Sequence, residues 1–389
     1  MYCEPQPPST LRVPATRSNV GTRGKSPRFI GSEIYRGSSY GGAHPLAIER
    51  VSTVIDLCAA LGWFASGQYH DSPLATDEQL ASWHDPAYVA ALRTAEANQG
   101  LDAATTARTG IGTAACPIHP RVFRRPATSA GGSLLAAQML VDGGVVHHPG
   151  GGTHHGRQAQ ASGFCYLNDI VLAARWWLSH GIERIFYLDL DAHHGDGVED
   201  AFADDHRVFT LSVHEAGRWP RTGLADERRG GAVRNLPVPP DFNDSELAAV
   251  MAHAVLPLID RFAPQAMIVQ AGADALAEDP LSRLALSNRA LWGAIDQVRD
   301  CAPRLLVLGG GGYNPWTLAR CWAGIWATLN DLPLPAQLPA AAETVLRTRG
   351  WNRKRPDPLP EAWFTTIVDS PRHGPVRDDI WRLIGEVMR

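Results

Sequence analysis

Short hydrophobic runs recur through the middle of the chain, and the segments between them have hydrophobic residues at helical spacing. Five of the runs predict β-strands over residues 145–146, 185–190, 208–213, 266–269 and 305–308. Because these runs are largely hydrophobic, we expect both faces of the strands to be buried. The alternation of strands and helices predicts an α/β fold, with a mainly parallel sheet and helices on both faces, in a single three-layer domain.

Two of the predicted helices are marked by their ends. Asn168 is a suitable N-cap, and hydrophobic residues follow it at helical spacing until Gly181, which ends the helix. Asn314 and Pro315 open a second helix, whose hydrophobic residues share one face as far as Leu329. Both helices directly follow segments rich in polar residues and glycine.

The domain organisation is predicted from changes in composition. Residues 27–330 carry the alternating pattern and form the main domain. Residues 1–26 are rich in Pro, Ser and Arg and predict a disordered tail. Residues 331–389 are interrupted by prolines and end in a predicted helix near residues 378–388. Since this C-terminal extension has tryptophans to bury, we expect it to pack on the core.

Composition narrows the possible partners and the location. The chain has 389 residues, 44% of them hydrophobic, and a net charge of −4, which gives no reason to expect direct contact with nucleic acid or a membrane surface. No hydrophobic run is long enough to span a bilayer. Six cysteines are scattered without CxxC pairs, which favours reduced thiols and a cytoplasmic location.

Polar residues gather where the predicted strands end. They are His154 and His155 after the first strand, Asp191 and His193 after the second, His214 after the third, Asp274 after the fourth and Tyr313 after the fifth. In parallel sheets the carboxyl ends of the strands form the active site, so these residues are expected to lie together. Taken alone, each motif has a simpler interpretation, such as an acidic turn or a surface histidine pair, and the coincidence over five strands argues against it.

The residue types at this edge suggest a metal-dependent hydrolase. Side chains alternate along an extended strand, so Asp189, Asp191 and His193 point to one side. Asp191, His193 and Asp274 supply two carboxylates and an imidazole, a set of three protein ligands that leaves a position for water, as in catalytic zinc sites. Such a metal polarises a carbonyl group and lowers the pKa of bound water.

Other residues at this edge suit acid–base work. His154 and His155 can both face one cavity if the glycine-rich loop before them is irregular, and Asp189 and Asp196 are available as carboxylate partners. Tyr313 follows four glycines and could donate its hydroxyl to a developing oxyanion.

These residues lie within motifs that resemble the histone deacetylase family. The motifs are Gly-Gly-Thr-His-His at 151–155, Ala-Ser-Gly-Phe-Cys-Tyr-Leu-Asn-Asp at 161–169, Asp-Leu-Asp-Ala-His-His-Gly-Asp-Gly-Val-Glu at 189–199, Gly-Ala-Asp at 272–274 and Gly-Gly-Gly-Gly-Tyr-Asn at 309–314. Their order and spacing match the family over most of the chain, and the pattern is most similar to bacterial members of the acetoin-utilisation type.

The resemblance implies an arginase-like fold and a zinc-dependent deacetylase, with residues 27–330 as the catalytic domain. The three ligands named above would hold Zn²⁺, with Fe²⁺ as an alternative. His154 and His155 would form a dyad with Asp189 and Asp196, and His155 would be the main general base and acid. Tyr313 would stabilise the tetrahedral intermediate.

The resemblance also implies a substrate tunnel and a structural potassium ion. The tunnel residues would be Gly163, Phe164, Trp219 and Leu281. The potassium ion would lie near Asp189, Asp191, His193, Ser212 and Val213.

The chain departs from the family pattern at the tunnel mouth. Ala115 stands where eukaryotic members have an acidic residue that holds the substrate backbone, which weakens the expectation of a firmly bound peptide main chain. The loop over residues 218–223 reads Arg-Trp-Pro-Arg-Thr-Gly in place of Phe-Phe-Pro-Gly-Thr-Gly. Three further arginines follow it and predict a basic mouth: Arg228, Arg229 and Arg234.

The function predicted from these features is removal of acetyl or other short acyl groups from lysine ε-amines of proteins, or from small acylated amines. Acetylated polyamines fit less well, because the sequence shows no acidic gatekeeper at Leu281, which follows Glu278, Asp279 and Pro280. Two alternatives are a binuclear manganese ureohydrolase on the same fold and a non-catalytic acyl-lysine binding protein. The number of metal ions per chain separates the deacetylase from the ureohydrolase.

Overall fold

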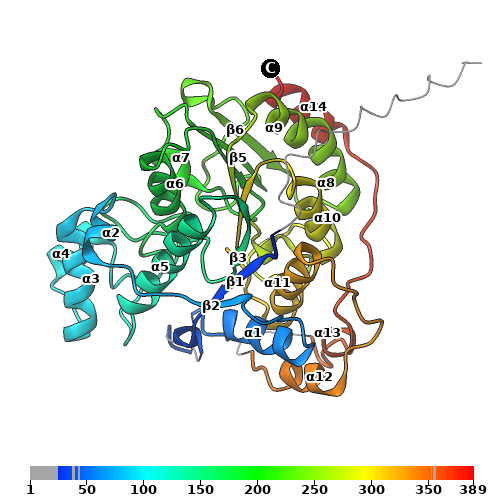
Figure 1. Cartoon of the computed structure of the whole chain (residues 1–389), viewed down its shortest axis with the longest axis horizontal. Helices are drawn as coiled ribbons and strands as arrows, with labels where there is room; N and C mark the ends of the chain where they lie inside the picture. Colours follow the sequence, from blue (N-terminus) through cyan, green and yellow to red (C-terminus); the bar gives the residue numbers. More distant parts are fainter. Residues whose placement is uncertain (1–24, 37–39, 43, 352, 354–355) are drawn as a thin grey trace, which may run out of the picture.

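The computed structural model describes residues 25–36, 40–42, 44–351, 353 and 356–389. Eight strands in this part of the chain form one sheet in which every pairing is parallel (Figure 1). They are β1 (Arg28–Gly31), β2 (Tyr69–Asp71), β3 (Gly144–His148), β4 (Ile185–Asp189), β5 (Val208–Glu215), β6 (Val233–Val238), β7 (Ala266–Gln270) and β8 (Arg304–Leu308). Their order in the sheet is β2-β1-β3-β8-β7-β4-β5-β6.

Helices connect the strands and cover both faces of the sheet (Figure 1). They are α1 (Val51–Ala60), α2 (Asp77–Ala81), α3 (Pro86–Asn98), α4 (Ala103–Thr109), α5 (Arg124–Met139), α6 (Asp169–Ser179), α7 (Asp196–Ala201), α8 (Asp244–Val250), α9 (Leu256–Phe262), α10 (Asn288–Val298), α11 (Pro315–Leu329), α12 (Ala340–Arg347), α13 (Ala362–Thr365) and α14 (Asp378–Val387). The predicted α/β class, with a parallel sheet between two layers of helices, is confirmed.

The alternation of side chains along the strands divides the core between the two faces. In β4, Phe186 and Leu188 pack into the core that α1 and α8 to α11 cover. Ile185 and Tyr187 point to the opposite face and pack with α5, α6 and α7. A third group of buried residues, including Tyr88, joins α2, α3 and α5 beside the sheet.

The C-terminal segment crosses the face formed by α1 and α11. Helix α12 lies against α1, and Leu346 is fully buried there. Trp363 stacks on Trp316 of α11, with ring centroids 5.4 Å apart. Helix α14 lies beside β6 and buries Ile380 and Val387. The segment thus contributes side chains to the same core as the sheet.

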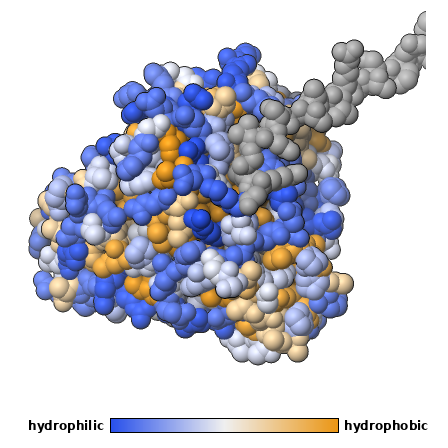
Figure 2. Space-filling view, viewed as in Figure 1, coloured by the Kyte–Doolittle hydropathy of each residue, from blue (hydrophilic) through white to orange (hydrophobic). Residues whose placement is uncertain are grey.

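The five predicted strands are all present, and α6 and α11 begin directly after Asn168 and Asn314, as expected. The predicted tail over residues 1–26 lies mostly outside the described residues. None of the described helices combines the length and hydrophobicity needed to cross a membrane. On the face shown in Figure 2, hydrophilic residues predominate and hydrophobic residues are scattered among them.

Candidate active site

The predicted site residues lie at the carboxyl ends of four neighbouring strands, in the order β3, β8, β7 and β4. The loops that leave these strands carry His154 and His155, Tyr313, Asp274, and the pair Asp191 and His193. Because the strands are parallel, all of these loops leave the sheet at the same edge. The fold therefore brings together residues that are up to 159 positions apart in the sequence, as between His154 and Tyr313.

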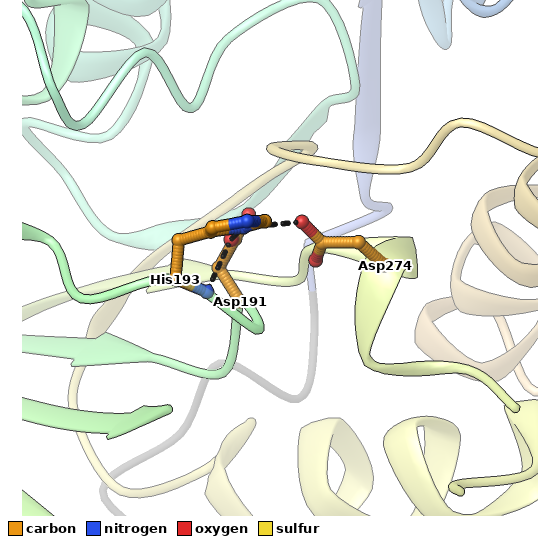
Figure 3. Close-up of side chains that lie close together, drawn as sticks. All are labelled: Asp191, His193 and Asp274. Carbon is orange, nitrogen blue, oxygen red and sulfur yellow. Dashed lines mark hydrogen bonds and ion pairs between the residues drawn. The ribbon is translucent and has the colours of Figure 1, made fainter. Parts of the chain in front are cut away.

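Asp191, His193 and Asp274 form a compact cluster, in which both aspartates are buried and His193 is slightly exposed (Figure 3). Their ligand atoms all lie within 4.8 Å of one another. His193 Nδ1 is 2.9 Å from Asp274 Oδ2 and 3.2 Å from Asp191 Oδ1. The Gly311 amide donates to Asp191 Oδ2 at 2.7 Å, which holds the carboxylate in place. Two carboxylate oxygens and an imidazole nitrogen at this spacing fit a divalent cation.

The cluster concentrates negative charge in a buried position, and the pKa values reflect this. Burial raises the pKa of Asp274, and the charge of Asp191 raises it further. Burial alone would lower the pKa of His193, but its hydrogen bonds with Asp191 and Asp274 raise it to about 10. A buried charge requires a compensating partner, and a cation would supply one for both carboxylates.

His154 forms a hydrogen bond with Asp189. Its Nδ1 donates to Asp189 Oδ2 at 2.8 Å, and Tyr187 Oη donates to the same oxygen at 2.6 Å. Burial opposes a charge on His154, but the carboxylates of Asp189 and Asp191 raise its pKa to about 9. Tyr187 was not among the predicted site residues, although it lies two positions before Asp189 on the same face of β4.

His155 is bound to Asp196 at the start of α7. Its Nδ1 donates to Asp196 Oδ1 at 2.7 Å, and Arg157 forms an ion pair with the other carboxylate oxygen. Burial and the charge of the adjacent His154 lower the pKa of His155 to about 3. Burial would raise the pKa of Asp196, but the hydrogen bond from His155 and the charge of Arg157 lower it.

Asp169 shapes the loop that presents the two histidines. Its carboxylate accepts hydrogen bonds from the backbone amides of Gly152, at 3.1 Å, and Thr153, at 2.8 Å. Gly152 has a φ of +96°, and a Cβ there would lie 2.7 Å from the Gly310 amide nitrogen. A glycine is therefore required where this loop passes the loop after β8.

Tyr313 is held by a residue that the sequence did not single out. Asp279 Oδ2 accepts a hydrogen bond from the Tyr313 amide at 2.6 Å, and its other oxygen accepts one from the Leu281 amide at 2.9 Å. Burial and the nearby charge of Asp274 raise the pKa of Asp279 to about 7. Asp279 thus ties the loop with Leu281 to the loop with the catalytic tyrosine candidate.

The predicted tunnel residues line one outer cavity of about 540 Å³, together with Ala115. The rings of Trp219 and His155 are in edge contact, with centroids 4.6 Å apart. The Phe164 ring lies 5.9 Å from the ring of Tyr313. Gly163 has a φ of +52°, and a Cβ there would overlap the Trp219 ring and lie 2.5 Å from His155 Cδ2. The inner part of the cavity, beside Gly163, is therefore an aromatic passage that reaches His155 and His193.

The mouth is basic through the loop over residues 218–223, but not through the three arginines that follow this loop. Arg228 and Arg234 donate to backbone carbonyls of Glu386 and Val387 in the C-terminal segment, and Arg229 pairs with Glu199. The arginines that line the outer cavity are Arg218, Arg221 and Arg283. The prediction was wrong for Arg228, Arg229 and Arg234, because these partners hold them outside the lining of the outer cavity.

The acidic residues near this mouth are paired with arginines and contribute little unpaired negative charge. Glu215 lines the outer cavity but is buried and forms ion pairs with both Arg218 and Arg283. Glu278 forms an ion pair with Arg372 and does not line the cavity. Two of the lining arginines thus share one buried glutamate.

The residues predicted for potassium lie on β4, on β5 and in the loop after β4. Asp189 and Ser212 are opposite each other in the β4–β5 register. Asp189 Oδ1 accepts a hydrogen bond from the Asp191 amide at 3.1 Å. His214 belongs to neither the metal-ligand cluster nor the histidine dyad. Its ring forms hydrogen bonds with Ser212 Oγ at 2.9 Å and with the Gly223 carbonyl at 3.1 Å. It therefore anchors the loop that carries Trp219.

Comparison with known proteins places this site in a family. The histone deacetylase domain model matches residues 44–329. The chain belongs to the histone deacetylase family. Its members are hydrolytic deacetylases, so this enzyme is a deacetylase, and the ureohydrolase and non-catalytic alternatives do not apply.

Relatives of this deacetylase come from bacteria and eukaryotes. It is 31% identical over 350 residues to the acetoin utilization protein AcuC of Bacillus subtilis, and the alignment covers 86% of this chain and 89% of AcuC. It is 32% identical over 310 residues to human histone deacetylase 1, which covers 77% of this chain and 64% of that protein. The predicted resemblance to the acetoin-utilisation type agrees with the first of these similarities.

Solved structures share the fold of this deacetylase. A crystal structure of an HDAC homolog from Aquifex aeolicus has a TM-score of 0.89 and 31% identity, and it covers 94% of this chain and 100% of that chain. An HDAC homolog complexed with SAHA has the same TM-score and coverage at 32% identity.

Proposed function

We propose that this deacetylase removes acetyl or another short acyl group from the ε-amine of lysine, with one divalent metal ion as cofactor. The observation that supports this most strongly is the cluster of Asp191, His193 and Asp274 at the inner end of the aromatic passage. Among the described residues, this is the one group of three or more metal-binding side chains. Zn²⁺ suits the ligand set, and Fe²⁺ is the alternative.

The passage suits the side chain of an acyl-lysine. Phe164 and Trp219 would flank the methylene stem, with Gly163 leaving room between Trp219 and His155. Leu281 would contact the substrate at the rim. The acyl carbonyl would then reach the cluster of metal ligands. When bound there, the metal supplies Lewis acidity that polarises the carbonyl and acidifies a water molecule.

The protein's own residues would move the protons. His155 is neutral and fixed by Asp196, so its Nε2 can accept a proton from the attacking water. The histidine pair can then protonate the departing amine. Tyr313 Oη would donate a hydrogen bond to the oxyanion that forms as the carbonyl becomes tetrahedral. A potassium ion near Asp189, Asp191, His193, Ser212 and Val213 would support the β4 and β5 ends, as the family resemblance implies.

The rim favours substrates that do not depend on a main-chain anchor. Ala115 lines the outer cavity where an acidic residue would be needed to hold a peptide backbone. Arg221 lines the same rim. We therefore propose lysines in flexible or acidic protein segments, or small acylated amines, as substrates. We also propose a cytoplasmic location, which rests on the scattered cysteines of the sequence.

The proposal is tested by acetate release from an acetyl-lysine peptide and from free Nε-acetyllysine. We expect the metal-loaded protein to release acetate from at least one substrate, and His155→Ala to abolish release. His180→Ala is the matched control, because His180 is exposed at the end of α6, bonds the Trp176 carbonyl and lines neither the outer nor the inner cavity. Acetate release that survives in His155→Ala would contradict the role of the dyad, and no release by the loaded parent would contradict the proposed reaction.

A further inference from the structure

A second, inner cavity of about 90 Å³ lies beyond the metal ligands. It shares His155, Gly163, Phe164 and Tyr313 with the outer cavity, so the two meet at the reaction site. An acyl-lysine that enters through the outer cavity would place the far end of its acyl group in this inner cavity. The residues that line its inner end therefore bear on acyl-chain preference.

Two arginines line the inner cavity, and neither forms an ion pair with any described residue. They are Arg50 and Arg125. One Nη of Arg50 donates to the Gly310 carbonyl, and its guanidinium lies 5.0 Å from the ring centre of Trp322. The Arg125 guanidinium lies 5.6 Å from the ring centre of Tyr35 and 5.5 Å from that of Tyr40. Among the described residues, the neighbours of the two cations are thus aromatic rings and a carbonyl, with no carboxylate in an ion pair.

Polar atoms of this group are buried and unpaired. Arg50 Nε, Arg125 Nη1 and Tyr35 Oη are enclosed and have no hydrogen-bond partner among the described residues. Enclosing such donors without a partner is unfavourable by about 1–3 kcal/mol each. Burial lowers the pKa of Arg50, and the positive charge of Arg125 acts in the same direction, whereas Tyr313 and Asp274 oppose it. An anionic occupant would relieve both conditions.

We propose that the inner cavity binds the terminal carboxylate of a short dicarboxylic acyl group, so that this deacylase removes malonyl- or succinyl-type groups from lysine. The inference rests on the proposed function. Guanidinium groups bind carboxylates through paired hydrogen bonds, which uncharged acyl chains cannot form. One water-sized group needs roughly 10–15 Å³ of such a cavity, so its volume suits a few heavy atoms and excludes long acyl chains.

The reaction is a simple hydrolysis. Water adds to the acyl carbon and the amide C–N bond breaks. The products are a dicarboxylate and the lysine amine, which takes up a proton. No oxidation or reduction occurs. Acetate would also be anionic, but only after cleavage, whereas a succinyl group carries its charge in the bound substrate. Binding of product acetate would therefore appear as product inhibition, whereas binding of the succinyl carboxylate would raise kcat/KM for the succinylated substrate.

The test compares succinyl-lysine with butyryl-lysine in the same peptide, because the two chains have equal carbon number and differ in charge. We expect kcat/KM for the succinyl peptide to exceed that for the butyryl peptide at least tenfold in the parent. Arg125→Met should lower this ratio about 10- to 100-fold, since it removes a charged hydrogen-bond partner of about 1.5–3 kcal/mol. Arg125→Lys, which keeps the charge, should restore part of the ratio.

Arg124→Met is the matched control. Arg124 is the neighbour of Arg125 in α5, but it is exposed, pairs with Glu96 and does not line the cavity. The ratio should be the same as in the parent. Hydrolysis of acetyl- but not succinyl-lysine would overturn this inference and leave the proposed function intact, as would an unchanged ratio in folded Arg125→Met. Product inhibition by acetate, without a succinyl preference, would assign the arginines to the leaving acid alone. Failure with every acyl peptide would overturn the proposed function itself.

Discussion

His154 and His155 are adjacent in the chain, but their rings donate to different carboxylates, those of Asp189 and Asp196. The ring centroids are 3.9 Å apart, so two positive charges would repel each other strongly. Asp189 and Asp191 favour a charged His154, and burial together with that charge keeps His155 neutral. Because a base must be neutral to accept a proton, His155 is the member of the pair that suits general-base catalysis.

The oxyanion role assigned to Tyr313 predicts a loss of turnover. Tyr313→Phe should lower kcat about 10²–10³-fold, because one donor to the developing charge is removed. Affinity for a hydroxamate inhibitor should change much less. Tyr69→Phe, in β2 outside the site, is the control and should retain kcat. Steady-state kinetics on an acyl-lysine peptide, with and without the inhibitor, measures kcat and the inhibitor affinity. Weakened inhibitor binding with unchanged kcat would assign Tyr313 to binding alone.

The narrow passage at Gly163 predicts a steric effect. Gly163→Ala should lower kcat/KM about 10- to 100-fold, because the new methyl group would displace Trp219 or His155 from its position. Gly181→Ala is a matched control: its φ is also positive, at +81°, but nothing lies within 4 Å of the added carbon. If both variants lose the same activity, the effect comes from backbone strain and not from the passage.

Candidate site residues could be selected from the sequence where they stand within a recognisable motif. The metal ligands, the dyad and Tyr313 stand in short motifs, so their types and spacing were sufficient to select them. Asp279, Arg50 and Arg125 could not be selected this way. Their significance depends on what the fold places beside them, such as the Tyr313 amide and the inner cavity.

At the level of elements, the strands that were predicted are the central ones. Strands β3, β4, β5, β7 and β8 are buried on both faces, and their hydrophobic runs marked them. Strands β1, β2 and β6 lie toward the edges of the sheet and were missed. Two of these are only three and four residues long, and β6 contains Arg234 and Pro237, which break the hydrophobic run.

The N-cap of α11 predicts a link between helix stability and the site. Asn314 Oδ1 accepts from the Trp316 amide at 3.1 Å, and its Nδ2 donates to the Glu278 carbonyl at 3.2 Å. Asn314→Ala should lower the free energy of unfolding by about 1 kcal/mol, as for other lost caps, and should also lower kcat through the adjacent Tyr313. Asn98→Ala, at an exposed position in α3, should change stability by less than about 0.5 kcal/mol. Unfolding in denaturant measures the stability of the two variants. An equal loss of unfolding free energy in Asn314→Ala and Asn98→Ala would argue against the role of Asn314 as a cap.

At the scale of the whole molecule, one parallel sheet places every candidate site residue at one edge, while helices on both faces supply the stability. The group of buried residues beside the sheet is tied to the site through His84. Its ring bonds the Gln158 carbonyl at 3.1 Å and accepts from the Asn168 amide at 3.0 Å. Asn168 in turn donates to the Gly156 carbonyl at 3.0 Å, next to the catalytic loop.

This buried histidine predicts how stability depends on pH. Burial lowers the pKa of His84 from 6.5 to about 4, so the folded protein binds fewer protons than the unfolded chain between these values. The contribution of neutral His84 is complete above pH 6.5 and is lost as the pH falls toward 4. The free energy of unfolding should therefore decrease as the pH is lowered from 6.5 to 4, and His84 should contribute up to about 1.4 kcal/mol per pH unit to this decrease.

The variant His84→Gln isolates this contribution. Its unfolding free energy should depend less steeply on pH between 6.5 and 4 than that of the parent. His180→Ala, at an exposed position, should leave the dependence as it is. Buried His119 and His147, whose pKa values burial lowers to about 4, act in the same direction and should keep part of the slope. An unchanged slope in His84→Gln would contradict the assignment.

The central claim is that one metal ion per chain supports hydrolysis of acyl-lysine at the Asp191, His193 and Asp274 cluster. The most direct test is to strip the protein with a chelator and titrate it with Zn²⁺ while acetate release from an acetyl-lysine peptide is followed. We predict that activity rises in proportion to added zinc and reaches a plateau at one equivalent per chain, and that Asp274→Asn requires far more zinc. A plateau at two equivalents, or full activity in the stripped protein, would contradict the account.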